Sequence, residues 1–407
     1  MTKENGKPQI RFAKFKDTWE QRKLGDFGKT TGGTSIESEF SEEGQYKVIS
    51  IGSYSENSVY NDQGLRAIKS DKTNNRVLNR NDLTMILNDK TTSGNIIGRV
   101  LLIEESGIYV YNQRTERIEI NVNEYDPVFL YEMLNAPNIR EKIIKQAQGN
   151  TQIYVNWPTI SLLDYMIPSK EEQVKIGECL HNLSNLITLH QRKYDKLTKA
   201  KKSMLEKMFP KNGTNVPEIR FKGFTDAWEQ RKLSEVAEFN PKSELPETFE
   251  YVDLESVVGT EMVSHRTETR ETAPSRAQRL ARTGDVFFQT VRPYQRNNYL
   301  FEKPDNNYVF STGYAQMRPK IDAEFLMCFL QTDSFVKVVL DNCTGTSYPA
   351  INSNDLSNLE IVLPASDDEQ RRIGSFISNL DNLITLHQRK LEKLKILKKA
   401  CLEKMFV

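Results

Sequence analysis

The sequence has no apolar run near the 18 residues that a membrane-spanning helix requires, and its polar N-terminus leads into no apolar stretch. We therefore expect neither a membrane span nor a secretory signal, and we place the protein in the cytoplasm. Cysteine is scarce, and its copies form no CxxC pair and stand at no metal-ligand spacing from histidine. Reduced, structural thiols and no metal site are expected at Cys179, Cys328, Cys343 and Cys401.

Motifs of nucleotide, cofactor and nuclease chemistry are missing as well. The chain contains no GxxxxGK[ST] loop and no GxGxxG turn. Adenine methyltransferases use an N/D-P-P-Y/F element, and Asn240-Pro241-Lys242-Ser243 lacks its second proline and its aromatic residue, so we interpret it as a turn. No D-x-K or E-x-K of a PD-(D/E)xK nuclease occurs, and His181 and His265 indicate no nucleophile–base pair. We expect a chain without a catalytic site of its own.

No charge of one sign dominates. The 407 residues include 56 Lys and Arg against 55 Asp and Glu, a formal net charge of +1, whereas many DNA-binding proteins are far more basic. Charge alone therefore argues weakly against a nucleic-acid partner. The length predicts two or three domains, and 38% apolar with 27% charged residues is typical of a folded, soluble protein.

The sequence does contain an internal repeat of two separate blocks. Ile10 to Leu24 returns as Ile219 to Leu233 with eleven of fifteen positions identical, WEQRKL among them. Leu183 to Phe209 returns as Leu380 to Phe406 with nineteen of twenty-seven identical, including LITLHQRK and LEKMF. Because drift after a plain duplication would blur the whole chain evenly, the abrupt block edges predict a common frame that is used twice.

Each second block belongs to a long predicted helix. A proline and an S-x-x-E capping box at Ser169 and at Ser366 precede proline-free stretches that suit helices of about 40 residues, roughly 60 Å long. Glycines early in each helix, Gly177 and Gly374, indicate close packing or a bend. The many lysines and arginines of the outer faces are interpreted as solvated, with DNA backbone or acidic partner surfaces as the alternative.

The apolar residues of these helices alternate by four and three, as in a coiled coil. Since an isolated helix would expose this stripe, we expect the two copies to pair antiparallel about a pseudo-twofold axis, with a parallel dimer of two chains as the alternative. His190 and His387 occupy equivalent seam positions and are interpreted as packed and hydrogen-bonded rather than metal ligands. The predicted seam and subunit-docking residues are Leu183, Ile187, His190, Tyr194, Leu197, Met204 and Met208, and then Leu380, Ile384, His387, Leu391, Leu394 and Met405.

The inserts between the blocks, residues 25–165 and 234–361, share little that can be aligned, yet both mix strands with short helices. The predicted fold class is therefore α+β, with two β-rich domains joined by the two long helices. Expected strands are Tyr46 to Ile51, Leu83 to Leu87, Ile96 to Ile103, Arg114 to Ile120 and Gly284 to Gln289. Expected helices are Asp126 to Leu134, Asn138 to Gln146, Ala323 to Leu330 and Ser334 to Leu340.

Several loops of the inserts carry groups suited to DNA. Arginine can bridge guanine O6 and N7, asparagine and glutamine can bridge adenine N6 and N7, and serine, threonine and lysine suit phosphates. Polar loops are common on any protein, so each loop alone is a weak signal. The predicted DNA-binding residues are Lys90, Thr91, Thr92, Ser93, Asn95, Arg99, Asn112, Gln113, Arg114, Asn150 and Gln152 in the first insert, and Thr290, Arg292, Tyr294, Gln295, Arg296, Asn297, Asn298, Thr344, Thr346, Ser347 and Tyr348 in the second.

The two FxxFxxxWEQRKL blocks, the paired LITLHQRK…LEKMF helices and the GTSYPAIN loop at Gly345 to Asn352 resemble the specificity (S) subunits of type I restriction-modification systems. The resemblance covers nearly the whole chain. It implies target-recognition domains over residues 1–168 and 211–365, and long spacer helices over residues 169–210 and 366–407. Each domain would read one half of a bipartite, asymmetric DNA site, and the helices would set the distance between the halves.

The resemblance also implies partners that carry the chemistry. Two modification (M) subunits would bind S-adenosylmethionine and methylate adenine N6, after flipping it from the stack. Two restriction (R) subunits would use ATP and Mg²⁺ to translocate and cut unmodified DNA. The alternative function is a coiled-coil scaffold or adaptor that binds proteins only; DNA binding that depends on both inserts distinguishes the two. The target bases and the length of the gap do not follow from the sequence.

Overall fold

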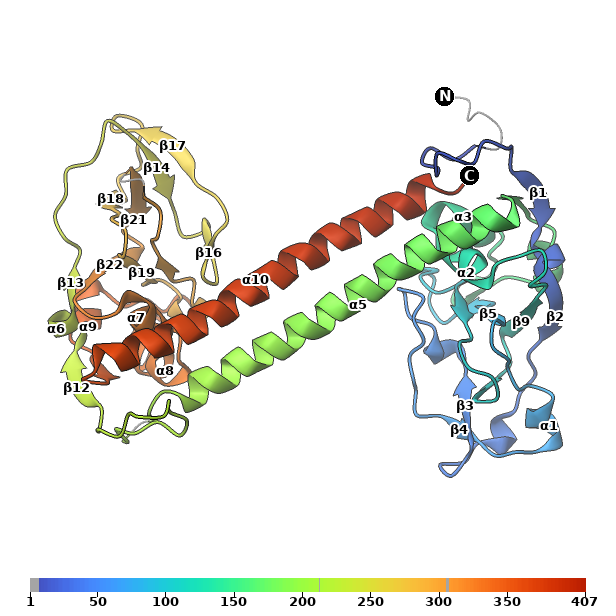
Figure 1. Cartoon of the computed structure of the whole chain (residues 1–407), viewed down its shortest axis with the longest axis horizontal. Coiled ribbons are helices and arrows are strands. Elements are labelled where there is room, and N and C mark those ends of the chain that lie inside the picture. Colours follow the sequence, from blue (N-terminus) through green and yellow to red (C-terminus); the bar gives the residue numbers. More distant parts are fainter. Residues whose placement is uncertain (1–6, 212, 305–306) are drawn as a thin grey trace. The chain divides into compact units, whose positions relative to one another are not determined.

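The protein is described by a computed structural model over residues 7–211, 213–304 and 307–407 (Figure 1). The chain forms two compact units: the first comprises the chain up to His190 together with Lys390–Val407, and the second comprises Gln191–Arg389. Two 38-residue helices, α5 (Lys170–Lys207) and α10 (Asp367–Lys404), contribute residues to both units. Within the described ranges, no helix combines the length and the apolar character that crossing a membrane requires.

The first domain contains a four-stranded sheet, in the order β2-β9-β5-β7, and a three-stranded sheet, in the order β4-β3-β8. Its strands are β1 (Glu20–Lys23), β2 (Gly28–Gly32), β3 (Tyr46–Ile49), β4 (Arg66–Ala67), β5 (Leu83–Ile86), β6 (Asn88–Asp89), β7 (Val100–Leu102), β8 (Tyr109–Tyr111), β9 (Thr115–Ile120), β10 (Ile153–Tyr154) and β11 (Asp164–Ile167). Its helices are η1 (Leu24–Phe27), η2 (Glu37–Glu39), η3 (Ile51–Ser53), α1 (Asp71–Asn74), α2 (Pro127–Asn135), α3 (Pro137–Ile144) and α4 (Trp157–Ile160).

The second domain repeats this plan with a four-stranded sheet, β13-β22-β19-β20, and a second sheet, β17-β14-β21-β18. Its strands are β12 (Glu229–Lys232), β13 (Ala237–Phe239), β14 (Thr248–Val252), β15 (Val257–Val258), β16 (Glu261–Met262), β17 (Arg266–Thr269), β18 (Ala277–Leu280), β19 (Val286–Gln289), β20 (Tyr299–Leu300), β21 (Tyr308–Ser311), β22 (Tyr314–Pro319) and β23 (Glu360–Leu363). Its helices are α6 (Leu233–Val236), η4 (Pro293–Gln295), α7 (Ala323–Leu330), α8 (Asp333–Asp341) and α9 (Ser353–Ser357).

The two divergent inserts therefore adopt one fold. In both domains the strand of the repeated WEQRKL block pairs antiparallel with the strand that precedes a long helix, β1 with β11 and β12 with β23. Each second sheet has one parallel pair, β3 with β8 and β14 with β21. Most predicted elements lie at their expected places. The strand predicted for Ile96 to Ile103 is wrong in its first half, because residues 96–99 close a loop and β7 begins only at Val100.

The long helices begin where they were predicted, but the predicted capping-box glutamates have other partners. Glu172 accepts two hydrogen bonds from the Arg11 guanidinium, both at 2.7 Å, and Glu369 accepts the equivalent pair from Arg220 at 2.6 and 2.8 Å. Both glutamate side chains are 1% exposed. The serine half of the predicted box is confirmed at Ser366, whose hydroxyl accepts from the N–H of Glu369 at 3.4 Å. The glutamate half is wrong, because a carboxylate removed from water gains more from a bidentate arginine than from one backbone N–H. The contact joins each repeated N-terminal block to a repeated helix.

The early glycines of the long helices permit a close approach of the domain helices α2 and α7. A Cβ on Gly177 would lie 2.9 Å from the backbone N of Phe129, and a Cβ on Gly374 would lie 2.7 Å from the backbone N of Phe325. Real Cβ atoms do not come so close to a backbone atom. The close packing predicted for these two glycines is confirmed.

Within each unit, the end of one long helix lies beside the other helix (Figure 1). Lys398 Nζ lies 2.7 Å from Ser184 Oγ in the first unit, and Lys201 Nζ lies 2.5 Å from Asp381 Oδ1 in the second. Because residues late in one helix meet residues earlier in the other, the helices run antiparallel, as predicted. The predicted seam residues from Leu183 to Met204 and from Leu380 to Leu394, including both histidines, are buried or half-buried.

The seam ends before the last predicted positions. Met208 and Met405 follow the last residues of α5 and α10 and are buried in the domain cores, so they do not extend the seam. The phenylalanine after each methionine is buried in the same core. The ring centroid of Phe209 lies 5.5 Å from that of Phe325, and the ring centroid of Phe406 lies 5.7 Å from that of Phe129. Each domain core therefore includes the end of the long helix from the other half of the sequence.

Candidate nucleic-acid interface

In the first unit, the fold brings together two predicted DNA-binding loops that are about sixty residues apart. β6 opens the loop that carries Lys90 to Asn95, and it pairs with β10, so that Asp89 lies opposite Ile153. The N–H of Val155 donates to the carbonyl oxygen of Leu87 at 2.8 Å, directly after β10. The loop after β5 and the hairpin over residues 148–154 consequently form one surface.

The second unit brings its two predicted loops together in the same way. The N–H of Ile351 donates to the carbonyl oxygen of Thr290 at 3.0 Å, and the N–H of Arg292 donates to that of Pro349 at 2.8 Å. Thr344 and Ala350 exchange backbone hydrogen bonds and close the hairpin over residues 344–350. The loops after β19 and before α9 are therefore one continuous feature, although the sequence separates them by about fifty residues.

The two hairpins occupy the same position in their domains but carry different tips. Gln148 and Tyr154 exchange the closing hydrogen bonds that Thr344 and Ala350 exchange in the second domain. Each hairpin begins with a glycine of positive φ, +101° at Gly149 and +83° at Gly345, a conformation that favours glycine. After these glycines the tips read Asn150-Thr151-Gln152 and Thr346-Ser347-Tyr348, all exposed. An amide thus stands in one domain where an aromatic ring stands in the other.

A buried carboxylate accepts hydrogen bonds from the loop that carries residues 90–95 of the first domain. Asp89 is 3% exposed and accepts hydrogen bonds from the N–H and the hydroxyl of Thr91, both at 2.9 Å, and from the N–H of Ile96 at 3.0 Å. Burial alone would raise the pKa of Asp89, but these hydrogen bonds outweigh it and hold the pKa below its ordinary value. The charged carboxylate therefore fixes the turn that presents residues 90–95.

Two half-buried arginines lie beneath the same loop. Arg140 donates to the carbonyl oxygens of Gly94 and Ile97 at 3.0 and 2.9 Å, and Arg99 donates to that of Asn95 at 3.0 Å. Burial, and secondarily the charge of Arg140, lowers the pKa of Arg99 to about 10. At neutral pH both guanidinium groups remain charged and hold the loop through its backbone. Their charges are balanced in part by the nearby carboxylates of Asp89 and Glu56.

The second loop is held by amides. Gln289 donates through Nε2 to the carbonyl oxygen of Val291 at 2.7 Å and to Oε1 of Gln295 at 2.9 Å. Its own N–H donates to Oδ1 of the buried Asn298 at 2.9 Å. Arg296 is tied to Asp333 and to the carbonyl oxygen of Gln331. In this loop Tyr294, at 49%, and Gln295 are exposed, and Arg292 is half-buried.

The predicted DNA-binding residues divide by exposure. Three of them are buried and support the backbone instead: Asn112 accepts from the N–H of Ile36, Thr290 donates to the carbonyl oxygen of Gly313, and Asn298 accepts from Gln289. Their side chains cannot reach a base edge here, which corrects the prediction for them. Half-buried positions are Arg99, Gln113, Arg292, Arg296 and Asn297. The exposed positions are Lys90, Thr91, Thr92, Ser93, Asn95, Arg114, Asn150, Gln152, Tyr294, Gln295, Thr344, Thr346, Ser347 and Tyr348.

Sequence reasoning missed the residues that position the loops. Asp89, Arg140 and Gln289 are buried or half-buried and were not among the predicted site residues. The Asp89-Lys90-Thr91 order is typical of a turn in which an aspartate caps the backbone two residues on, and it is the one local signal available. Arg140 has no such signal, because it acts on a loop more than forty residues away in the sequence. The partners of Gln289 are local, at Val291 and Gln295, but no turn motif marks it.

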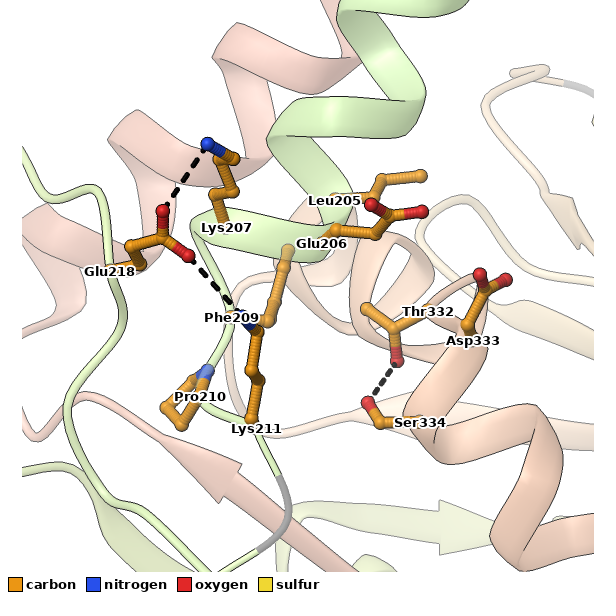
Figure 2. Close-up of a pocket in the computed structure, with 10 residues that line it drawn as sticks. All are labelled: Leu205, Glu206, Lys207, Phe209, Pro210, Lys211, Glu218, Thr332, Asp333 and Ser334. Atoms are coloured by element: carbon orange, nitrogen blue, oxygen red, sulfur yellow. Dashed lines mark hydrogen bonds and ion pairs between the residues drawn. The ribbon is translucent and has the colours of Figure 1, made fainter.

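The second unit has a hollow of about 440 Å³ at the end of α5 (Figure 2). Its charged groups largely pair with one another: Glu218 lies 3.2 Å from Lys207 and 3.3 Å from Lys211, and these lysines lower the pKa of Glu218. The remaining lining residues are Leu205, Glu206, Phe209, Pro210, Thr332, Asp333 and Ser334. The hollow offers neither a histidine nor a cysteine, so it provides no nucleophile–base pair and we interpret it as a helix–domain junction.

Comparisons with known proteins agree with this picture. The family model for the type I restriction modification DNA specificity domain matches residues 16–199 and 225–396. The specificity subunit of the type I restriction enzyme MjaVIII from Methanocaldococcus jannaschii is 24% identical over 422 residues, covering 98% of this chain and 94% of that protein. The specificity subunit of HindI from Haemophilus influenzae is 28% identical over 141 residues, covering 33% of this chain and 30% of that protein.

A solved structure shares the fold. The crystal structure of the S subunit of a type I restriction-modification system from M. genitalium matches with a TM-score of 0.62 and 17% sequence identity, over 98% of this chain and 99% of that chain. The family model matches each half of the chain separately, which agrees with the two domains and two helices described above.

Proposed function

Because this chain belongs to the specificity subunits of type I restriction-modification systems, we propose that each of its domains binds one half of a split, asymmetric DNA site. The observation that carries the proposal is the pair of hairpins. They occupy equivalent places in two domains of one fold, yet Gln152 stands at the tip of one and Tyr348 at the tip of the other. Two domains of the same fold whose hairpins carry different residues at the tip are suited to two half-sites of different sequence.

The long helices would set the distance between the half-sites and dock the methyltransferase subunits. Supporting this, the outer faces of α5 and α10 expose equivalent leucine pairs: Leu186 and Leu189 are 42% and 47% exposed, and Leu383 and Leu386 are 43% and 45% exposed. Leucines in equal places on both helices are suited to two copies of the same partner, since exposed apolar groups gathered on one face favour protein contacts.

The chemistry would belong to the partners. Two M subunits would supply S-adenosylmethionine and methylate adenine N6, and two R subunits would supply ATP- and Mg²⁺-dependent translocation and cleavage. This chain would contribute binding, orientation and site choice. The family's role as a non-catalytic specificity subunit accords with the absence of phosphate-cradling and nucleophile–base motifs from its sequence.

Methylation mapping tests the proposal. The chain is co-expressed with its M subunit in a host free of other DNA methylation, and the genome is sequenced by a method that detects methyl-adenine. We expect one split motif with methyl-adenine in both halves. A verified complex that yields no motif would contradict the proposal and favour a scaffold that binds proteins only.

The two domains can be tested separately. Replacing residues 25–165 by the insert of another specificity subunit should change one half-site and leave the other as it was. The reciprocal exchange of residues 234–361 is the matched control and should change only the other half. A change of both halves in either chimera would contradict independent reading by the two domains.

A further inference from the structure

The two domains differ most sharply at one equivalent position of their first loops. In the first domain Asp89 lies opposite Ile153, the residue before Tyr154, which closes the hairpin. In the second domain Arg292 bonds to Pro349, the residue before Ala350, which closes the equivalent hairpin. Asp89 and Arg292 therefore occupy the same place in the fold with opposite charges. The aspartate is buried and holds its own loop, whereas the arginine is directed to the hairpin tip.

Arg292 is held in a defined conformation. Its φ of +54° lies in the left-handed region, which is uncommon for a residue with a side chain, and its N–H is fixed to Pro349. The guanidinium carbon lies 4.5 Å from the centre of the Tyr348 ring. Tyr348 is 65% exposed and Arg292 is half-buried, so the ring supports the guanidinium at the surface of the domain. A ring contact of this kind restrains the guanidinium without occupying its hydrogen-bond donors.

The charge of Arg292 also differs from that of its neighbour. Arg296 is neutralised by Asp333, whereas no carboxylate of the residues that the structure describes forms an ion pair with Arg292. An arginine that rests on an aromatic ring, and that forms no ion pair among the described residues, suits a ligand with two adjacent acceptors. In the major groove of DNA, guanine O6 and N7 are that pair, and arginine is their commonest partner.

We propose that Arg292, supported by Tyr348, reads a guanine in the half-site of the second domain. The inference rests on the proposed DNA-binding function and names one base contact within it. Because Asp89 stands at the equivalent position of the first domain, the first half-site has no matching guanine contact from this position. From this one position of the fold, only the second domain would therefore impose a guanine.

The test is methylation mapping with Arg292→Lys and Arg292→Gln chains, each co-expressed with the M subunit. In the wild-type motif, one half-site should contain a fixed guanine on one strand. Both variants should relax that position, with preference over other bases reduced roughly tenfold to a hundredfold, and leave the other half-site unchanged. Lysine keeps the charge and can still donate to guanine, but it lacks the planar fork of paired donors, so Arg292→Lys should relax the position less than Arg292→Gln, which also removes the charge.

Variants of Tyr348 form the second part of the experiment. Tyr348→Phe keeps the aromatic face and should preserve the guanine preference, whereas Tyr348→Ala removes the support and should weaken it in part. Arg282→Gln removes one exposed charge elsewhere in the same domain and serves as the matched control, with an unchanged motif expected. Thermal melting of each purified chain confirms that the variants fold.

Three outcomes would overturn the proposal. One is full retention of the guanine preference by Arg292→Gln. Another is a uniform loss of methylation in Arg292→Gln with no position relaxed, which would assign Arg292 to a phosphate. The third is a wild-type motif with no fixed G·C pair in the half-site of the second domain. If wild-type complex gives no split motif at all, the proposed function fails first, and the two failures are thereby distinguished.

Discussion

Lys398 Nζ lies 3.1 Å from a carboxylate oxygen of Glu132, and the equivalent lysine, Lys201, meets Asp381 instead. Glu132 belongs to the domain helix α2, whereas Asp381 belongs to the long helix α10. The lysine is therefore equivalent in the two units, whereas its carboxylate partner lies on a domain helix in the first unit and on a long helix in the second. Each unit thus pairs the same half-buried lysine with one carboxylate from a different element.

The two lysine pairs should differ in their contribution to stability. The side chain of Glu132 is 3% exposed and that of Asp381 is 29% exposed. Lys398→Met leaves a carboxylate that water cannot reach and should lower the free energy of unfolding by about 3 kcal/mol, whereas Lys201→Met should cost about 1 kcal/mol. Urea denaturation of the full chain measures both. The double variant Lys398→Met with Glu132→Gln should regain most of the loss, and equal losses in both single variants would contradict this account.

The arginine that binds the start of each long helix should tolerate no replacement by lysine. Arg11 donates two hydrogen bonds to the buried Glu172, and lysine cannot reproduce that geometry. Arg11→Lys should therefore destabilise the first unit by about 2 kcal/mol, and limited proteolysis should cut more readily near residue 12. The matched control is Lys14→Met, because Lys14 and its partner Glu171 are 55% and 69% exposed and should contribute little.

Stability should fall as the pH rises through the titration of one buried carboxyl. Burial raises the pKa of Glu116 to about 7, although Arg76 and Thr30 act in the opposite direction. The unfolded chain loses this proton near the ordinary pKa of 4.5, so the contribution is complete below about pH 4.5 and lost above about pH 7. Glu116→Gln should match the wild type near pH 5 and exceed it by about 2 kcal/mol at pH 8. Denaturation at both pH values checks this, with the exposed Glu119→Gln as the control.

Gly374 should be intolerant of alanine although it lies inside a helix. In an open helix the substitution stabilises by about 1 kcal/mol, but here the new Cβ would lie 2.7 Å from the backbone N of Phe325. The backbone must shift, and we expect a net loss of about 2 kcal/mol. Asn379→Ala, on the next turn of the same helix, is exposed and serves as the comparison in thermal melting. A stabilised Gly374→Ala chain would show that α7 does not pack closely against α10.

The sequence by itself determined the repeat, the two long helices and the capped start of α2. These features depend on local rules: identical blocks adopt identical structures, a stretch without proline continues as a helix, and Asp126 before Pro127 caps the helix, accepting from the N–H of Phe129 at 2.8 Å. The loops that carry the candidate site were also recognisable from their polar residues. None of these conclusions requires knowing what lies nearby in space.

Only the tertiary structure decided what each polar residue does. Asn112, Thr290 and Asn298 have the same chemistry as their exposed neighbours, yet burial turns them into supports. Glu172 was expected to cap its own helix and instead binds Arg11. The equivalence of Asp89 and Arg292 is visible only in the pairing of each residue with the hairpin of its own domain. The physical reason is that a hydrogen bond or ion pair is made with whichever partner the fold brings within reach, and in these domains that partner comes from far along the chain.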